Sequence, residues 1–253
     1  MLMLDKKNIY KDVRKEFATV LQATWAKLRH TRWYPAPCHL CSQDTRTRFG
    51  LCSRCTQQWQ RSQAARHFCR GCGVSVEQPG LCAHCYVHGP AFSEVRAAAV
   101  WDERSRYFVH QLKYQADFSV TRFMAEQMAA RIQSDPGLAV MQMIPMPQHP
   151  KRRNTRGFNQ AILLADALSK QLNLPVDRDV AARVVDTPSL TGLNRGQRRA
   201  ALRDAFTIQQ PPQPCLAIVD DVLTTGASAG ALADKLYAAG AQQVCVWVFA
   251  RVE

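Results

Sequence analysis

Two adjacent carboxylates and a hydroxyl-rich turn follow one short apolar run near the end of the chain. The apolar residues 216–219 include β-branched members and predict a buried parallel strand. Asp220 and Asp221 come next, followed by a turn over residues 222–228. The alanine-rich stretch after the turn predicts a helix up to residue 239. The expected order is therefore strand, acid pair, turn and helix.

This turn has the residue types that hold a phosphate group. A helix N-terminus presents unpaired N–H groups and the positive end of the helix dipole. Thr224, Thr225 and Ser228 add hydroxyl donors, and Gly226 lets the backbone come close to a phosphate. The acids, at the carboxyl edge of the sheet, can accept hydrogen bonds from sugar hydroxyls or hold Mg²⁺ through water. An ordinary strand–turn–helix is the alternative, but the combination of groups favours a phosphate site.

Eight of the ten cysteines form four Cys-x-x-Cys pairs. They are Cys38, Cys41, Cys52 and Cys55, followed by Cys69, Cys72, Cys82 and Cys85. Two such pairs make a tetrahedral four-thiolate zinc site, which is closed and therefore structural. The segment is too small and polar for a large core, so we expect zinc to supply its folding energy. Neighbouring pairs are expected to share a site, with interleaved pairing left open.

The chain is strongly basic, with a formal net charge of +13 over 253 residues, and should attract polyanions. Residues 45–76 contain no acid. Arg61, Arg66 and Arg70 lie there among aromatic residues, a combination that suits single-stranded nucleic acid, with charge for phosphates and rings for bases. The alternative, that the rings form a small core and the arginines are solvated, is left open.

From residue 97 onward the sequence alternates strand and helix patterns. Strands are expected at residues 97–101, 141–144, 216–219 and 243–250, the last closing the sheet, and helices at 105–114, 119–134, 156–172 and 194–206. This order predicts an α/β fold, a parallel doubly wound sheet with helices on both faces. A further helix is expected at residues 8–30, and a linker at 87–93. We expect a helical segment over residues 1–34, a zinc-binding module over 35–90 and the α/β domain over 91–253.

Residues 148–160 form a second basic stretch without acids. Lys151, Arg152, Arg153 and Arg156 lie in it. A mobile basic loop above a phosphate site could close over pyrophosphate, and a solvated loop is the alternative. We expect Arg152 to join Arg61, Arg66 and Arg70 in contacting nucleic acid.

The sequence also indicates where the protein works. No run approaches the roughly 18–20 apolar residues of a membrane span. The N-terminal residues lack the pattern of a signal peptide. Together with the regular cysteine pairs, this favours the reducing cytoplasm.

These motifs resemble those of a known family. Residues 219–228 are similar to the phosphoribosyl pyrophosphate (PRPP) signature of type I phosphoribosyltransferases. With the cysteine pairs, residues 112–114 (Leu-Lys-Tyr) and residues 153–160 (Arg-x-x-Arg-Gly-Phe-Asn-Gln), they make residues 36–251 resemble the ComF family of competence-related proteins, GntX-type members included. The glycine common in that family shortly after Lys-Tyr is absent, and Gln115, Ala116 and Asp117 stand there.

The resemblance implies a zinc-bearing module on a type I phosphoribosyltransferase-like domain that acts in uptake or processing of transforming DNA. Implied partners are single-stranded DNA, PRPP with Mg²⁺, and other DNA-uptake proteins at the inner face of the membrane. Asp220 and Asp221 are implied to take the ribose hydroxyls, and Lys113, Arg153 and Arg156 to face the pyrophosphate. The 5′-phosphate is implied to lie on Thr224, Thr225, Gly226, Ala227 and Ser228.

Three functions compete on these observations. The charge and the acid-free arginine stretch favour a DNA-handling protein that binds PRPP or a related ribose phosphate. A metabolic phosphoribosyltransferase with a zinc scaffold is the alternative, and the intact phosphate turn argues against a pure adaptor. In purine phosphoribosyltransferases an Asp three residues after the second acid can accept a proton, and Thr224 stands there instead. A threonine hydroxyl is a poor general base near neutral pH, so transfer activity is left open.

Overall fold

The computed structural model describes residues 37–43, 50–134, 137–186, 202 and 204–253. The helix expected at residues 8–30 lies outside these residues, as does most of the helix expected at 194–206.

A parallel sheet forms the centre of the molecule, in the strand order β3-β8-β7-β4. The strands are β3 (Glu94–Val100), β8 (Gln243–Arg251), β7 (Cys215–Leu223) and β4 (Gln142–Pro145). All three strand pairs are parallel, which confirms the predicted fold class. The prediction that residues 243–250 close the sheet is wrong, because β8 lies between β3 and β7. Its almost fully buried run is what an interior parallel strand requires.

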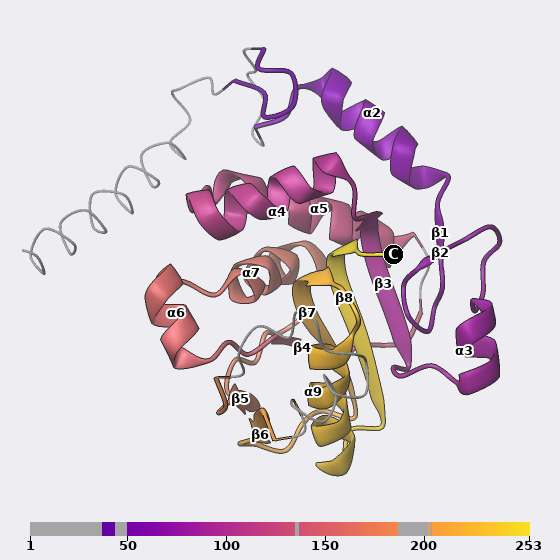
Figure 1. The fold of residues 1–253 in the computed structure, drawn as a ribbon, viewed down its shortest axis with the longest axis vertical. Helices are drawn as coiled ribbons and strands as arrows, with labels where there is room; N and C mark the ends of the chain where they lie inside the picture. The colour runs from indigo at the N-terminus through magenta and orange to yellow at the C-terminus, as the bar shows by residue number, and fades with distance from the viewer. Residues whose placement is uncertain (1–36, 44–49, 135–136, 187–201, 203) are drawn as a thin grey trace, which may run out of the picture.

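Helices cover both faces of the sheet, as expected (Figure 1). On one face lie α4 (Glu103–Gln115), α5 (Ser119–Gln133) and α7 (Gln160–Leu172), and on the other lies α9 (Ala227–Ala238). Each face has its own hydrophobic cluster, so the sheet is buried on both sides.

The basic stretch before α7 is folded differently from the expected loop and single helix. It contains a short helix, α6 (Pro150–Arg156), which ends where Gly157 takes a left-handed conformation with φ 85°. Glycine adopts that conformation without strain, so the chain can turn there. Asn159 then starts α7, since its side chain accepts a hydrogen bond from the Ala161 amide at 2.9 Å.

Two short strands were not predicted at all. They are β5 (Ala181–Arg183) and β6 (Phe206–Ile208), which pair antiparallel outside the main sheet. Three residues are too few for an alternating pattern to stand out. The pair packs beside α9 through the buried Phe206.

The cysteine-rich segment forms two small ribbons that pack on the α/β part. The first ribbon contains Cys38, Cys41, Cys52 and Cys55, and the second contains Cys69, Cys72, Cys82 and Cys85. The segment includes α2 (Ser53–Ala64), β1 (His67–Phe68), β2 (Ser75–Val76) and α3 (Ala83–His88), so the expected linker begins only after His88. Figure 1 shows α2 crossing above α4 and α5. There Trp59 is fully buried and stacks on Phe249 of β8, with ring centroids 5.7 Å apart. Phe108 and Phe123 meet the same indole edge-on. The first ribbon therefore shares the core of the sheet.

The second ribbon covers the open edge of the sheet. The Val95 amide of β3 donates to the Arg70 carbonyl at 2.7 Å. Arg251, the last residue of β8, donates from Nε to the Cys72 carbonyl at 2.7 Å. The Nη1 atom of the same side chain donates to the carbonyls of Leu223 and Thr224, at 3.2 and 2.6 Å. One guanidinium thus joins the second ribbon to the turn that follows β7.

Candidate functional site

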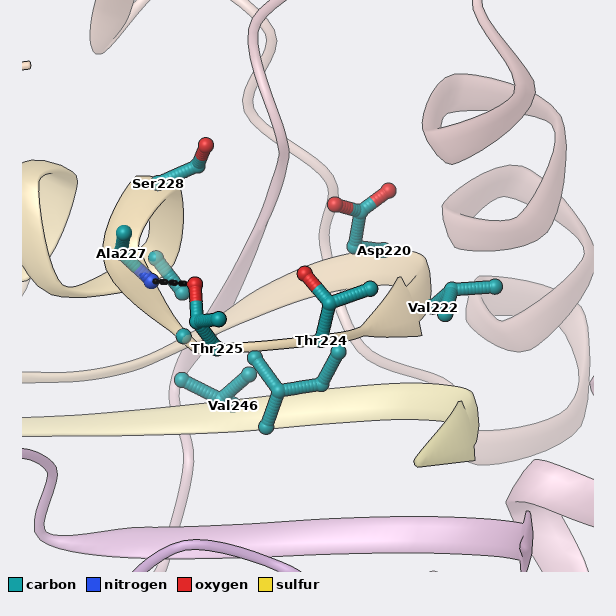
Figure 2. A pocket seen from close by; sticks show the side chains of 10 residues that line it. Asp220, Val222, Thr224, Thr225, Ala227, Ser228 and Val246 are labelled. Carbon is teal, nitrogen blue, oxygen red and sulfur yellow. Dashed lines mark hydrogen bonds between the residues drawn. The ribbon is translucent and has the colours of Figure 1, made fainter. Parts of the chain in front are cut away.

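A pocket of about 350 Å³ opens where β7 ends and α9 begins, a size within the usual range for ligand sites. Its lining is Asp220, Val222, Leu223, Thr224, Thr225, Gly226, Ala227, Ser228, Ala229 and Val246. Figure 2 shows the side-chain oxygens of Asp220, Thr224, Thr225 and Ser228 on the same side of this turn. The structure therefore brings Asp220 together with the five residues predicted to hold the phosphate.

The start of α9 leaves its first amides available to an anion. Gly226 is the N-cap, takes φ 76° and makes no side-chain cap. The Ala227 amide reaches only the Thr225 hydroxyl, at a long 3.4 Å (dashed in Figure 2). Because the first turn of a helix has no intrahelical partners for its N–H groups, this end suits a phosphate.

The two acids point to opposite faces of the sheet, as successive strand residues must. Asp220 lines the pocket. Asp221 does not line it; it is 1% exposed and lies 2.6 Å from the Lys113 ammonium group. Burial, together with the negative charge of Asp221, raises the pKa of Asp220 well above its usual range, although Lys113 opposes this. The acid pair therefore consists of one pocket carboxyl and one buried ion-pair partner.

Lys113 belongs to a chain of polar contacts that reaches the basic stretch. Asp221 also accepts a hydrogen bond from the Gln160 amide at 3.4 Å, and Gln160 accepts one from Arg156 at 2.7 Å. Burial alone would lower the pKa of Lys113, but the charges of Asp221 and Asp220 outweigh it and raise that pKa. The ammonium group therefore stays charged beside the acid pair.

The rest of the basic stretch is held away from the pocket lining. Asp186, after β5, lies 3.5 Å from both Lys151 and Arg152 and 4.0 Å from His149. Arg153 is exposed. None of these residues lines the pocket that the described residues form. The expected pyrophosphate contacts of Arg153 and Arg156 remain predictions.

Sequence reasoning assigned no role to two residues near the acid pair. Gln160 lies in the motif at residues 153–160, but its contact with Asp221 depends on how α7 packs. Burial, and after it the positive charge of Arg152, lowers the pKa of Arg183 of β5. Asp186 and Asp220 lie close enough for their negative charges to oppose this shift. No local pattern marks Arg183, because the short strand that carries it has no signal of its own.

The eight paired cysteines form two clusters in the described part of the chain. Cys38, Cys41, Cys52 and Cys55 make one, and Cys69, Cys72, Cys82 and Cys85 the other. Neighbouring pairs thus share a site, which was the simplest expectation. Within each cluster all sulfur atoms lie within 4.8 Å of one another. The Cys41–Cys52 and Cys72–Cys82 sulfurs are 3.7 Å apart, against about 3.8 Å for a tetrahedron with 2.3 Å Zn–S bonds.

Backbone amides favour the thiolate form of one cysteine in each cluster. Burial opposes ionisation of Cys38, but hydrogen bonds from the amides of Cys52, Cys41 and Leu40 lower its pKa to about 6. In the same way the amides of Cys82, Cys72 and Gly71 outweigh burial and lower the pKa of Cys69 to about 7. Thiolates are the form that binds zinc, so the residues fit two structural zinc ions.

Two aromatic residues of the acid-free arginine stretch, Trp59 and Phe68, are core residues, whereas His67 is exposed. Trp59 is 0% and Phe68 7% exposed, and the Arg131 guanidinium covers the Phe68 ring at 5.0 Å. These two rings have no free face for a base. Arg61 and Arg70 remain exposed, and Arg66 is half-buried.

The residues after Lys113 explain how the chain manages without the family's glycine. Ala116 ends α4 in the left-handed conformation, with φ 49°. Glycine takes this conformation freely, whereas alanine does so at a cost of about 1–2 kcal/mol. The turn is therefore kept although the glycine is not.

Comparison with known proteins agrees with this architecture. Residues 31–86 match the family model of the double zinc ribbon domain. Competence protein F of Haemophilus influenzae is 28% identical over 211 residues, which is 80% of this chain and 90% of that protein. The DNA utilization protein YhgH of Salmonella typhimurium is 28% identical over 86% of this chain and 97% of its own length. Competence protein ComFC of Streptococcus pneumoniae is 25% identical over 77% and 84%.

The fold is a type I phosphoribosyltransferase-like parallel sheet with helices on both faces, and it carries a double zinc ribbon. The relatives that match over most of their length are named as competence or DNA utilization proteins. This similarity over most of the chain supports its resemblance to the ComF family. Within the described part of the chain, every helix is too short or too polar to span a bilayer.

Proposed function

We propose that this protein serves in competence-related DNA handling and binds PRPP, or a related ribose phosphate with Mg²⁺, in the pocket after β7. The observation that carries the ligand is the convergence of a free helix start, three hydroxyls and the Asp220 carboxyl on one pocket. The names of the relatives, for competence and DNA utilization, support the wider role.

Each part of such a ligand has a matching group near the pocket. The amides and hydroxyls of residues 224–228 suit the 5′-phosphate. The Asp220 carboxyl suits a ribose hydroxyl, and as a hard oxygen ligand it also fits Mg²⁺. Lys113 and Arg156 supply positive charge beside the acid pair, where a pyrophosphate would need it.

Single-stranded DNA is the second proposed ligand. The net charge of +13 favours polyanions, and the arginines of the ribbons, together with Arg152 and Arg153 of α6, are the proposed phosphate contacts. The proposal covers binding and does not include phosphoribosyl transfer. Thr224 stands in the pocket where a carboxylate base would be needed for one such reaction.

Calorimetric titration tests the pocket. PRPP with Mg²⁺ should bind the zinc-loaded wild type, and Asp220→Asn should lower the affinity about tenfold or more by removing a charged acceptor. The asparagine keeps the shape of the side chain. Asp234→Asn, an exposed position on α9, is the matched control and should bind as the wild type does.

Single-stranded DNA should be titrated alone and then with PRPP present. Affinity for DNA should fall steeply as salt rises, because released counterions drive the binding.

In the calorimetric test of the pocket, absence of PRPP binding to the wild type, or equal heats from wild type and Asp220→Asn, would refute the assignment of the pocket.

A further inference from the structure

Two tyrosine rings stand mostly exposed among the described Phe, Tyr and Trp residues. They are Tyr86, 81% exposed, and Tyr114, 67% exposed. Protein sites for single-stranded nucleic acid need rings with a free face, on which bases stack, together with positive charge for the phosphates. Trp59 and Phe68 are buried, so these two tyrosines are the rings to consider.

Their surroundings distinguish the two tyrosines. Tyr86 lies on α3 near exposed apolar residues, Leu81 and Val87. Tyr114 lies in the last turn of α4, with the Arg156 guanidinium 5.8 Å from its ring centroid. The exposed His110 stacks at a tilt against it, with centroids 5.1 Å apart. Tyr114 thus combines an exposed ring with a neighbouring cation.

The position of Tyr114 also fits a strand of DNA. The residue directly before it, Lys113, pairs with Asp221 of the acid pair. Arg156 is the last residue of α6, whose side chains Lys151, Arg152 and Arg153 are exposed. A base on the Tyr114 ring would therefore leave its neighbouring phosphates close to a helix that carries four cations and no acid.

We propose that the Tyr114 ring, flanked by His110 and Arg156, is the seat on which a base of single-stranded DNA stacks. The seat deepens the proposed function, on which it rests, by locating the DNA beside the ribose phosphate pocket rather than on the ribbon aromatics. Base stacking tolerates any sequence, because every base has a flat face.

Fluorescence anisotropy with a labelled oligothymidine tests the seat. Tyr114→Ala should weaken binding by about 5- to 150-fold, the range for loss of one stacked base. The dependence on salt should keep its slope, because no cation is removed. Tyr86→Ala is the matched control, an exposed tyrosine of the same chain, and should bind as the wild type does. Tyr114→Trp should retain affinity, and the introduced indole should be quenched by the oligonucleotide.

A second oligonucleotide separates stacking from phosphate binding. A fully abasic strand of the same length should bind wild type and Tyr114→Ala equally. If the wild type binds oligothymidine and Tyr114→Ala binds it equally well, the seat is wrong and the proposed DNA binding stands. If Tyr86→Ala loses as much affinity for oligothymidine as Tyr114→Ala does, a special role for Tyr114 is overturned. If the wild type does not bind, the proposed DNA function is overturned and the seat with it.

Discussion

At the scale of single residues, the acid pair shows how one residue type takes two roles. Asp221 faces the helices and has a fixed cation, Lys113, as its partner. Asp220 faces the pocket, where burial and the charge of Asp221 raise its pKa. A carboxyl in such surroundings lowers the stability of the folded protein when it is ionised. A ligand that compensates its charge restores that stability.

The raised pKa of Asp220 predicts how stability depends on pH. A carboxyl with a higher pKa in the folded state binds its proton more tightly there than in the unfolded chain, whose pKa is about 3.9. Its contribution is fully present below that value and is lost as pH rises through the folded-state pKa. Asp220→Asn lacks this loss, so its advantage in stability over the wild type should grow with pH.

Urea unfolding of both zinc-loaded proteins between pH 5 and 8 measures the difference. Comparing the two at each pH cancels the effect of pH on the zinc thiolates, which they share. A constant difference across the range would show that the Asp220 carboxyl has an ordinary pKa in the folded protein.

Much of this site could be predicted from residue types and spacing. Strand, acids, hydroxyls and glycine are consecutive, so the order of residues alone places them at one helix start. The contact of Lys113 with Asp221 is different, because it depends on where the fold places the end of α4 relative to the end of β7. The position of Gln160 above Asp221 likewise depends on the packing of α7.

At the scale of elements, Trp59 is the largest side chain of α2 in the core of the sheet. Trp59 is enclosed by Phe108, Phe123 and Phe249, which come from α4, α5 and β8. Deleting a buried aromatic ring removes its burial and leaves a cavity. The first ribbon should therefore depend on this contact as well as on its metal.

Trp59→Ala should lower the free energy of unfolding by about 3–5 kcal/mol. Tyr86→Ala, an exposed aromatic in the second ribbon, should change it by no more than about 0.5 kcal/mol. Urea unfolding of zinc-loaded proteins compares them. Equal midpoints for Trp59→Ala and the wild type would mean that the ribbon is not docked as described.

Regular elements were predictable where the pattern was long. The helix at Ser119–Gln133 agrees with its expected span of 119–134 almost to the residue, and the strands of the main sheet were all expected. The helix α6 was missed, because its Arg-rich residues were expected to form a loop, and α7 was expected to begin at residue 156 rather than at Gln160. Only the backbone at Gly157 and the cap at Asn159 show the break.

At the scale of the whole molecule, Arg251 connects two parts that the sequence separates. Its guanidinium donates to the Cys72 carbonyl of the second zinc cluster and to the Leu223 and Thr224 carbonyls at the pocket. We therefore expect a displacement of either part to disturb a hydrogen bond that this guanidinium makes with the other. Binding at two sites linked in this way is reciprocal.

Removal of zinc should consequently weaken ribose phosphate binding. Freshly purified protein should contain about two zinc ions per chain, one for each tetrahedral site. After chelation, calorimetry with PRPP and Mg²⁺ should show a loss of affinity that zinc restores. Arg251→Met should show a weaker affinity before chelation and a smaller further loss after it. Full affinity in metal-free protein would mean that the pocket does not depend on the ribbons.

The hydrogen bond between Val95 and Arg70 bears on how this chain can be shortened. A fragment beginning at residue 91 would carry the pocket but would leave β3 with an uncovered backbone edge. It would also leave the aromatic recess of Trp59 empty. An open strand beside an apolar recess is a template for strands of other molecules, so such a fragment is expected to self-associate and collect in inclusion bodies. We therefore expect the ribbons to protect the rest of the chain against aggregation, whether or not they bind a ligand.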